Sequence, residues 1–119
     1  SMWEGSLVTL YPDPNLEQSF GEINYAISMA TIECHFWMNN MFWDDDDWIL
    51  NNIDVIKDIP TTIAHGRYDV DCRAIGAYEL SKKLNNCKLD IVVSGHSSGE
   101  PAIVDSLVRS TDYFKELLK

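Results

Sequence analysis

T-T-I-A-H-G-R-Y-D-V-D, residues 61–71, and D-I-V-V-S-G-H-S-S-G-E-P, residues 90–101, are the two stretches that decide the fold of this chain. Each begins as a short run of apolar and β-branched residues, ends at a glycine and a polar loop, and leads into a helical pattern. This is typical of adjacent parallel strands in an α/β sheet. Because ligands bind outside the carboxyl ends of such strands, polar residues in the two loops are the functional candidates. They include an acid, Asp69, and a histidine, His96.

The residues around these loops predict a strand, helix, strand, helix order. We expect strands over 61–64 and 89–93 and helices over 73–84 and 101–118, with Pro101 in the first turn of the last helix. The unit is then a right-handed βαβ crossover followed by a covering helix.

The first half of the chain predicts helices only. Residues 16–40 are too densely apolar for a single stripe, so we expect one long helix that is buried on most sides. Residues 48–59 predict one or two short helices that Pro60 ends. We therefore place a helical domain at residues 1–59 and an α/β domain at residues 60–119.

Charge and cysteine content limit the partners and the compartment. Nine basic and nineteen acidic residues give a net charge of −10, which argues against nucleic acid and anionic membranes as partners. Cationic ligands, including peptide N-termini, remain compatible with it. Cys34, Cys72 and Cys87 are widely spaced, and we interpret them as reduced thiols of a cytoplasmic protein. No apolar run approaches the length of a membrane span.

No metal or cofactor is expected. The acidic run at residues 44–47 can be interpreted as a calcium site or as a solvated loop without a ligand. The glycine and closing glutamate of an EF-hand loop are absent from the run, so we favour the solvated loop.

The two loops suggest an acid–base pair. His96 follows a strand in a glycine-flanked loop, where it is either a general base or an ordinary surface histidine. Asp69 can orient the imidazole and stabilise its charged form, or it is a turn residue. Asp71 is better placed than Asp69 to cap the helix that begins near Arg73. We discount His65, because it ends the strand and is expected to point into the sheet interior.

A second interpretation of the same loop is a nucleophile elbow. G-H-S-S-G at residues 95–99 matches G-x-S-x-G, with Ser97 as the nucleophile. We reject it on chain order, because the histidine of an α/β-hydrolase triad follows the nucleophile and no histidine follows Ser97. The loop instead fits the last position of that order, and the serine is expected before residue 1.

Glu33 lies within the apolar segment of the predicted long helix. A buried carboxylate is costly unless it is paired or hydrogen-bonded. It is therefore either a structural acceptor or a receptor for a cation, and composition does not separate the two.

Four motifs, taken together, resemble a known family. They are W-E-G at residues 3–5, I-E-C-H-F at 32–36, H-G-R-Y-D at 65–69 and G-H-S-S-G-E-P at 95–101. They closely resemble the C-terminal part of the proline iminopeptidases (prolyl aminopeptidases), which are serine peptidases with the α/β-hydrolase fold. The resemblance covers essentially the whole chain and implies two parallel strands with flanking helices, preceded by the remnant of a helical cap domain.

The resemblance also implies roles for individual residues. Asp69 and His96 match the triad acid and base, and Glu4 and Glu33 match the two cap glutamates that hold the free amino group of an N-terminal proline. The implied reaction is acyl transfer to serine followed by hydrolysis, which releases proline from peptides. The nucleophilic serine and the oxyanion hole are missing, so we expect the isolated chain to be inactive.

Two alternatives stay open. In the first alternative, the chain is a non-enzymatic fragment that self-associates through the open edge of its first strand. Otherwise it belongs to another cap-bearing α/β-hydrolase, such as an esterase or an epoxide hydrolase. The substitution Glu33→Gln distinguishes a peptidase from an esterase, because only the peptidase has an amine to bind.

Overall fold

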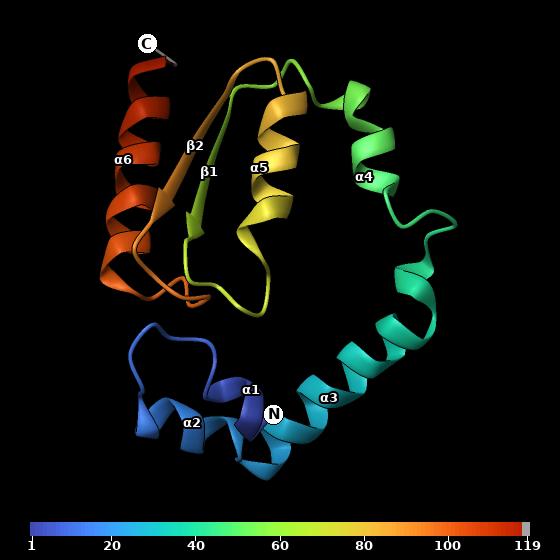
Figure 1. Cartoon of the computed structure of the whole chain (residues 1–119), viewed down its shortest axis with the longest axis vertical. Helices are drawn as coiled ribbons and strands as arrows, with labels where there is room; N and C mark the ends of the chain where they lie inside the picture. Colours follow the sequence, from blue (N-terminus) through green and yellow to red (C-terminus); the bar gives the residue numbers. More distant parts are fainter. Residues whose placement is uncertain (118–119) are drawn as a thin grey trace.

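The computed structural model describes residues 1–117, and its second half is built on two parallel strands. Strands β1 (Thr61–Gly66) and β2 (Cys87–Val92) pair in register from Thr61 opposite Cys87 to Gly66 opposite Val92. Helix α5 (Ala74–Lys83) joins them, and helix α6 (Pro101–Leu117) follows. The two helices lie on either side of the sheet, and each contacts both strands (Figure 1).

The predicted α/β class is therefore confirmed, and the arrangement is compatible with the C-terminal part of an α/β-hydrolase. The strands are displaced by about two residues from their predicted bounds. β1 continues to Gly66, and β2 begins at Cys87 instead of residue 89. The predicted last residue of the closing helix, Leu118, lies outside the described residues.

Short or medium helices make up the part of the chain that precedes the sheet. They are α1 (Met2–Gly5), α2 (Pro14–Phe20), α3 (Ile23–Met38), η1 (Asn40–Phe42), α4 (Trp48–Asn51) and η2 (Ile53–Val55). α4 and η2 correspond to the short helices expected over residues 48–59.

The single helix predicted over residues 16–40 is wrong, because the chain forms two helices there. α2 begins at Pro14, where the Asp13 carboxylate accepts hydrogen bonds from the backbone nitrogens of Asn15 and Leu16. It ends at Gly21, a residue type with low helix propensity. A Cβ atom on Gly21 would lie 3.0 Å from the Met2 side chain. Met2 of α1 therefore occupies the space that a side chain at position 21 would need.

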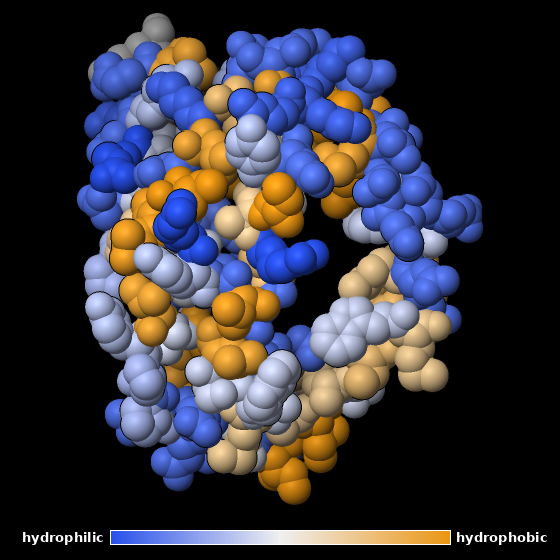
Figure 2. Space-filling view, in the orientation of Figure 1, coloured by the Kyte–Doolittle hydropathy of each residue, from blue (hydrophilic) through white to orange (hydrophobic). Residues whose placement is uncertain are grey.

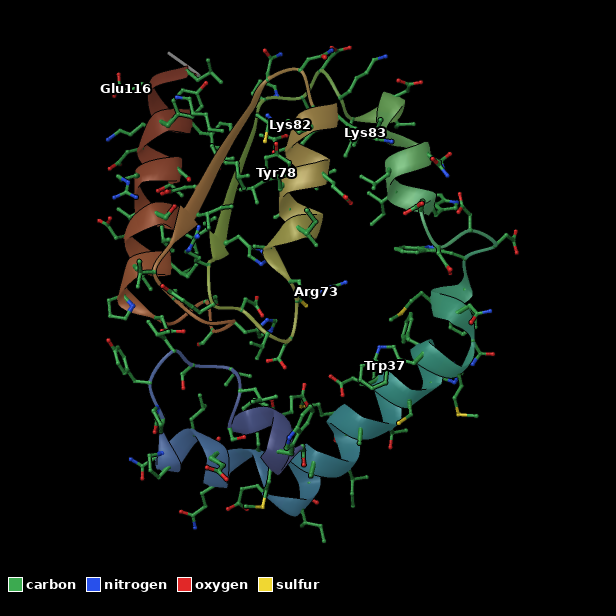
Figure 3. All side chains as sticks on the ribbon, viewed as in Figure 1. Trp37, Arg73, Tyr78, Lys82, Lys83 and Glu116 are labelled. Atoms are coloured by element: carbon green, nitrogen blue, oxygen red, sulfur yellow. The ribbon has the colours of Figure 1, made fainter. Side chains whose placement is uncertain are left out.

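The predicted burial of this segment is also wrong. None of the residues of α3 is buried, and Ile23, Trp37 and Met38 are 69%, 59% and 85% exposed. Within residues 1–117, the elements that pack appreciably on α3 are its sequence neighbours α2 and η1. Figure 2 shows an open space between α3 and the α/β half of the molecule. Trp37 and Arg73 both point toward that space (Figure 3). A densely apolar pattern indicates which surface a helix prefers to bury. Whether that surface is buried depends on the presence of a packing partner.

The buried apolar core is small. Its members are Val8, Ile53, Leu84 and Ile103. A link between α5 and α4 comes from Lys83, whose Nζ donates a hydrogen bond to the Leu50 carbonyl oxygen at 3.1 Å. Among residues 1–117, none of the helices combines the length and apolar character needed to cross a bilayer.

Candidate active site

The loops that follow the two strands continue to pair beyond the sheet. The backbone nitrogen of Arg67 donates to the Val92 carbonyl oxygen at 2.8 Å, and that of Tyr68 donates to the Ser94 carbonyl oxygen at 3.0 Å. A Cβ atom on Gly66 would overlap the carbonyl oxygen of Gly95, so this close approach requires glycine. The sheet register thereby brings the two loops into direct contact.

This contact joins the two residues that the sequence singled out. Asp69 Oδ2 lies 3.1 Å from His96 Nδ1. The Asp69 residue is only 9% exposed, and its other oxygen accepts hydrogen bonds from the backbone nitrogens of Asp71 at 3.0 Å and Cys72 at 2.8 Å. The carboxylate is thus held from two directions and can fix the orientation of the imidazole.

The predicted cap by Asp71 is wrong. Helix α5 has Arg73 at its N-cap position and has no side-chain cap. The Asp71 backbone nitrogen instead points back to Asp69, which makes Asp69 the residue that organises this turn.

His96 is oriented by its backbone as well as by Asp69. The backbone nitrogens of His96 and Ser97 both donate to the Val8 carbonyl oxygen, at 2.9 and 2.7 Å. Because Nδ1 faces a carboxylate, we assign the ring proton to Nδ1, which leaves a lone pair on Nε2. The side chain is 41% exposed, and Nε2 has no hydrogen-bond partner among residues 1–117. An imidazole in this state can accept a proton from an incoming hydroxyl group.

His65 does not point into the sheet interior, and that prediction is wrong. Its Nε2 lies 2.8 Å from the Cys72 carbonyl oxygen and 3.6 Å from Asp69 Oδ2. The turn organised by Asp69 folds back over the end of β1 and brings Cys72 against the His65 ring.

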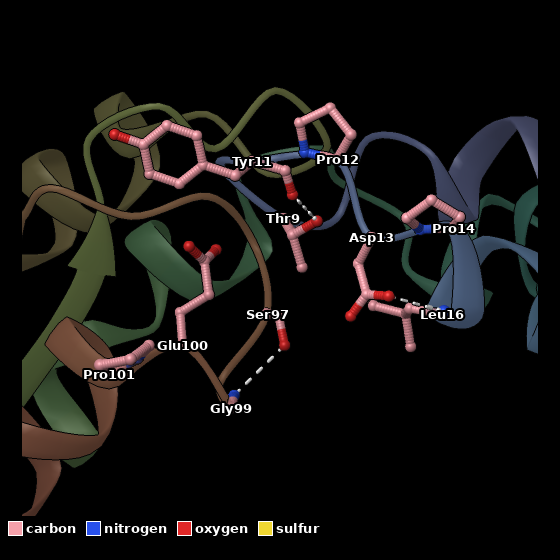
Figure 4. Close-up of a pocket in the computed structure, with 10 residues that line it drawn as sticks. All are labelled: Thr9, Tyr11, Pro12, Asp13, Pro14, Leu16, Ser97, Gly99, Glu100 and Pro101. Carbon is pink, nitrogen blue, oxygen red and sulfur yellow. Dashed lines mark hydrogen bonds between the residues drawn. The ribbon is translucent and has the colours of Figure 1, made fainter.

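Sequence reasoning missed Glu100, which precedes α6. Its carboxylate accepts hydrogen bonds from the backbone nitrogens of Gly95 at 2.8 Å and Leu10 at 3.2 Å. Together with the Val8 carbonyl, it fastens the start of the chain to the His96 loop. A pocket of about 440 Å³ lies beside this junction, between residues 9–16 and 97–101 (Figure 4). The sequence feature that could have indicated Glu100 is an acid directly before Pro101, the proline in the first turn of the helix. The hydrogen-bond partner of Glu100, Leu10, is remote in sequence.

Glu4 lies within electrostatic range of both Glu33 and the His96 loop. Burial raises the pKa of the Glu4 carboxyl, and the negative charges of Glu33 and Asp71 raise it further, whereas the N-terminus and His96 oppose the shift. Glu33 itself is half-buried. Two carboxylates that are close enough to interact are well suited to receive a cation between them.

One group of side chains has the spacing of metal ligands. Ligand atoms of Asp69, Asp71 and His96 all lie within 4.8 Å of one another. Both oxygens of Asp69 are already engaged by hydrogen bonds, so we interpret this group as an acid–base site. The four aspartates at residues 44–47 are exposed, and hydrogen bonds from Asn51 and the Asp47 backbone lower the pKa of Asp45.

Comparison with known proteins gives a consistent set of relatives, although no family model matches the chain. A probable proline iminopeptidase from Leptolyngbya boryana is 42% identical over 115 residues, which is 96% of this chain and 36% of that protein. The proline iminopeptidase of Xanthomonas citri is 40% identical over 96% of this chain and 37% of its own length. That of Arabidopsis thaliana is 39% identical over 98% of this chain and 31% of its own length.

The predicted resemblance to the proline iminopeptidases is confirmed. This chain spans roughly a third of the length of these proline iminopeptidases, from 31% to 37% among the three. A match over 96% of 119 residues spans the region that contains Glu33, Asp69 and His96. The similarity to proline iminopeptidases therefore extends over the paired acid and histidine and over at least one of the two glutamates.

Proposed function

We propose that this chain carries the acid, the base and the amine-binding carboxylates of a proline iminopeptidase. The observation that carries the proposal is the 3.1 Å contact between Asp69 Oδ2 and His96 Nδ1 at the carboxyl ends of two parallel strands. The proline iminopeptidase relatives support it.

In this proposal, His96 Nε2 removes the proton from a serine hydroxyl as the serine attacks the carbonyl carbon of the N-terminal residue of a peptide. Asp69 keeps the proton on Nδ1 and stabilises the imidazolium that forms. The imidazolium then protonates the departing amine, and water hydrolyses the acyl-enzyme by the same route.

The serine comes from outside these 119 residues. The hydroxyl of Ser97, the next residue in sequence, accepts a hydrogen bond from the Gly99 backbone nitrogen at 3.2 Å (Figure 4). Without the nucleophile and an oxyanion hole, a histidine–aspartate pair loses most of its rate enhancement, so the isolated chain is inactive.

Glu4 and Glu33 determine the substrate. A protonated imino group between two carboxylates is favoured over a neutral peptide nitrogen, so cleavage is confined to the first residue. The proline iminopeptidase relatives support proline as that residue. The enzyme acts in the cytoplasm, a location that the odd number of widely spaced cysteines supports.

The test compares this chain with the longest product of its gene on proline-β-naphthylamide. We expect the longer product to release proline and to be labelled by diisopropyl fluorophosphate on a serine outside residues 1–119. Asp69→Asn in that product should reduce kcat by about 10⁴-fold, the loss seen when the equivalent acid of the chymotrypsin triad is replaced. Asp112→Asn is the control, because Asp112 is exposed on α6.

Two results would contradict the proposal. Proline release by the 119-residue chain alone, abolished by Ser97→Ala, would establish Ser97 as the nucleophile. A longer product in which Glu33→Gln impairs peptide cleavage no more than it impairs the cleavage of simple esters would indicate an esterase or another cap-bearing hydrolase.

Self-association is a second candidate function, favoured by the exposed apolar surface. Side chains of α3 such as Ile27, Trp37 and Met38 are 59%, 59% and 85% exposed. β1 also has a strand partner on one side only within the described residues, and such edges pair with other chains. A monomeric sedimentation profile at high concentration would exclude this function.

A further inference from the structure

We propose that His65 is a positioning residue that holds the Asp69 loop in place for His96. Its catalytic relevance rests on the proposed function, whereas its structural basis is independent of it. His65 lies in β1 opposite Ile91, one residue before the strand ends, and its side chain is only 17% exposed.

The ring of His65 has a defined hydrogen-bond partner. Nε2 lies 2.8 Å from the carbonyl oxygen of Cys72. A carbonyl oxygen only accepts hydrogen bonds, so Nε2 must carry the proton. The ring is therefore a donor at Nε2, opposite to the Nδ1 donor assigned to His96.

Both backbone groups of Cys72, its carbonyl and its nitrogen, form hydrogen bonds. Its carbonyl accepts from His65, while its backbone nitrogen donates to Asp69 Oδ1 at 2.8 Å. The three residues form a closed loop of contacts that joins the rigid strand to the carboxylate. Asp69 cannot shift relative to β1 without breaking one of them.

The same proton also lies near the second carboxylate oxygen. His65 Nε2 is 3.6 Å from Asp69 Oδ2, the oxygen that faces His96 at 3.1 Å. Asp69 Oδ2 is thus placed between two imidazole rings, and the His65 N–H lies beside the oxygen that His96 contacts.

The first experiment reads the ring protons by long-range ¹H–¹⁵N NMR of the 119-residue chain. The chain has three histidines, so the spectrum is simple to assign. We expect neutral His65 to carry its proton on Nε2 and neutral His96 to carry its proton on Nδ1. A proton on Nδ1 of neutral His65 would overturn the proposal.

The second experiment uses two substitutions at His65 and matched ones at His35. His65→Leu removes the donor, whereas the amide of His65→Gln can still donate to the Cys72 carbonyl. His35 is exposed on α3, where its ring lies against Phe36 and Phe42, so His35→Leu and His35→Gln are controls. We expect the His96 Nδ1–H resonance to broaden or shift in His65→Leu and to persist in the other three variants. A resonance unchanged in a folded His65→Leu chain would overturn the proposal.

The kinetic counterpart uses the longer gene product. His65→Leu should lower kcat about tenfold, the equivalent of one hydrogen bond, with KM changed by less than about twofold. His65→Gln should restore most of the rate. An unchanged kcat in His65→Leu, or an equal loss of kcat in the His35 controls, would contradict a positioning role. If the parent protein does not cleave the substrate, the proposed function fails, and the NMR result still decides the role of His65.

Discussion

The carboxylate of Glu100 accepts a hydrogen bond from the backbone nitrogen of Leu10 at 3.2 Å, although the two residues are 90 positions apart in sequence. The same carboxylate accepts from Gly95 at 2.8 Å, directly before His96. A Cβ atom on Gly95 would lie 2.9 Å from the Leu10 nitrogen, so the two segments are in close contact. The position of His96 therefore depends on the first ten residues as well as on the sheet.

Glu100→Ala should destabilise the chain by about 2 kcal/mol, because hydrogen bonds to a charged, half-buried acceptor are lost. Urea unfolding followed by circular dichroism measures this. Glu79→Ala, at an exposed position on α5, should change the free energy of unfolding by less than about 0.5 kcal/mol. Equal effects of the two substitutions would mean that Glu100 does not fasten the N-terminal segment.

The two buried serines should respond differently to substitution by alanine. Ser94 is 0% exposed, and its hydroxyl has no hydrogen-bond partner within residues 1–117. Ser106 is 2% exposed, and its hydroxyl donates to Asp90 at 2.7 Å. We expect Ser94→Ala to be neutral or stabilising by up to about 1 kcal/mol and Ser106→Ala to cost about 1 kcal/mol. Thermal unfolding of both variants provides the comparison, and a destabilised Ser94→Ala would reveal a partner for that hydroxyl.

Ionised Glu4 should oppose folding near neutral pH. Burial and the charge of Glu33 raise its pKa above the ordinary value of 4.5, so the folded chain binds this proton more tightly than the unfolded chain. The stabilising effect of protonation is complete below the ordinary pKa and is lost as the pH rises through the raised pKa. Glu4→Gln should therefore have a higher free energy of unfolding than the parent chain at about pH 7, by less than about 1 kcal/mol.

The same difference should disappear at about pH 4, where Glu4 is protonated in the folded parent chain. Differential scanning calorimetry at both pH values measures it, with Glu79→Gln as the exposed control. A parent chain that is more stable than Glu4→Gln at neutral pH would show that the Glu4 carboxylate has a stabilising partner.

Removing apolar side chains from α3 should weaken self-association. Ile27→Ser and Trp37→Ser together remove two large side chains that are each 59% exposed. If these side chains are buried between copies, the dissociation constant should rise by at least tenfold, because each contributes about 1.5 to 3 kcal/mol when fully buried. Sedimentation equilibrium measures the change. Val93→Ser, at a 64% exposed site beside the sheet, should leave the dissociation constant unchanged.

The parts of this fold that sequence predicts best are those with local signals. Two β-branched runs that end at glycine predicted parallel strands, and the loops after them predicted that Asp69 and His96 would be close. The distance of 3.1 Å between them follows from the register of β1 and β2, which places both loops at one sheet edge.

The parts that sequence did not predict depend on contacts remote from the residue concerned. The break between the two helices at Gly21 depends on the packing of Met2. The orientation of His65 depends on the turn that Asp69 organises, because this turn brings Cys72, seven residues after His65, against the His65 ring. Exposure of α3 depends on which elements are available to cover it. Apolar density alone does not contain that information.

The placement of the tryptophans has an optical consequence. All four, Trp3, Trp37, Trp43 and Trp48, precede Pro60, and Trp43 stacks on Trp48 with ring centroids 5.5 Å apart. Indole fluorescence will therefore report on the helical half of the molecule, while the strands and the Asp69–His96 pair contribute no emission of this kind. Unfolding curves recorded by indole emission and by tyrosine emission, to which Tyr68, Tyr78 and Tyr113 contribute alongside Tyr11 and Tyr25, will coincide only if the two halves melt together.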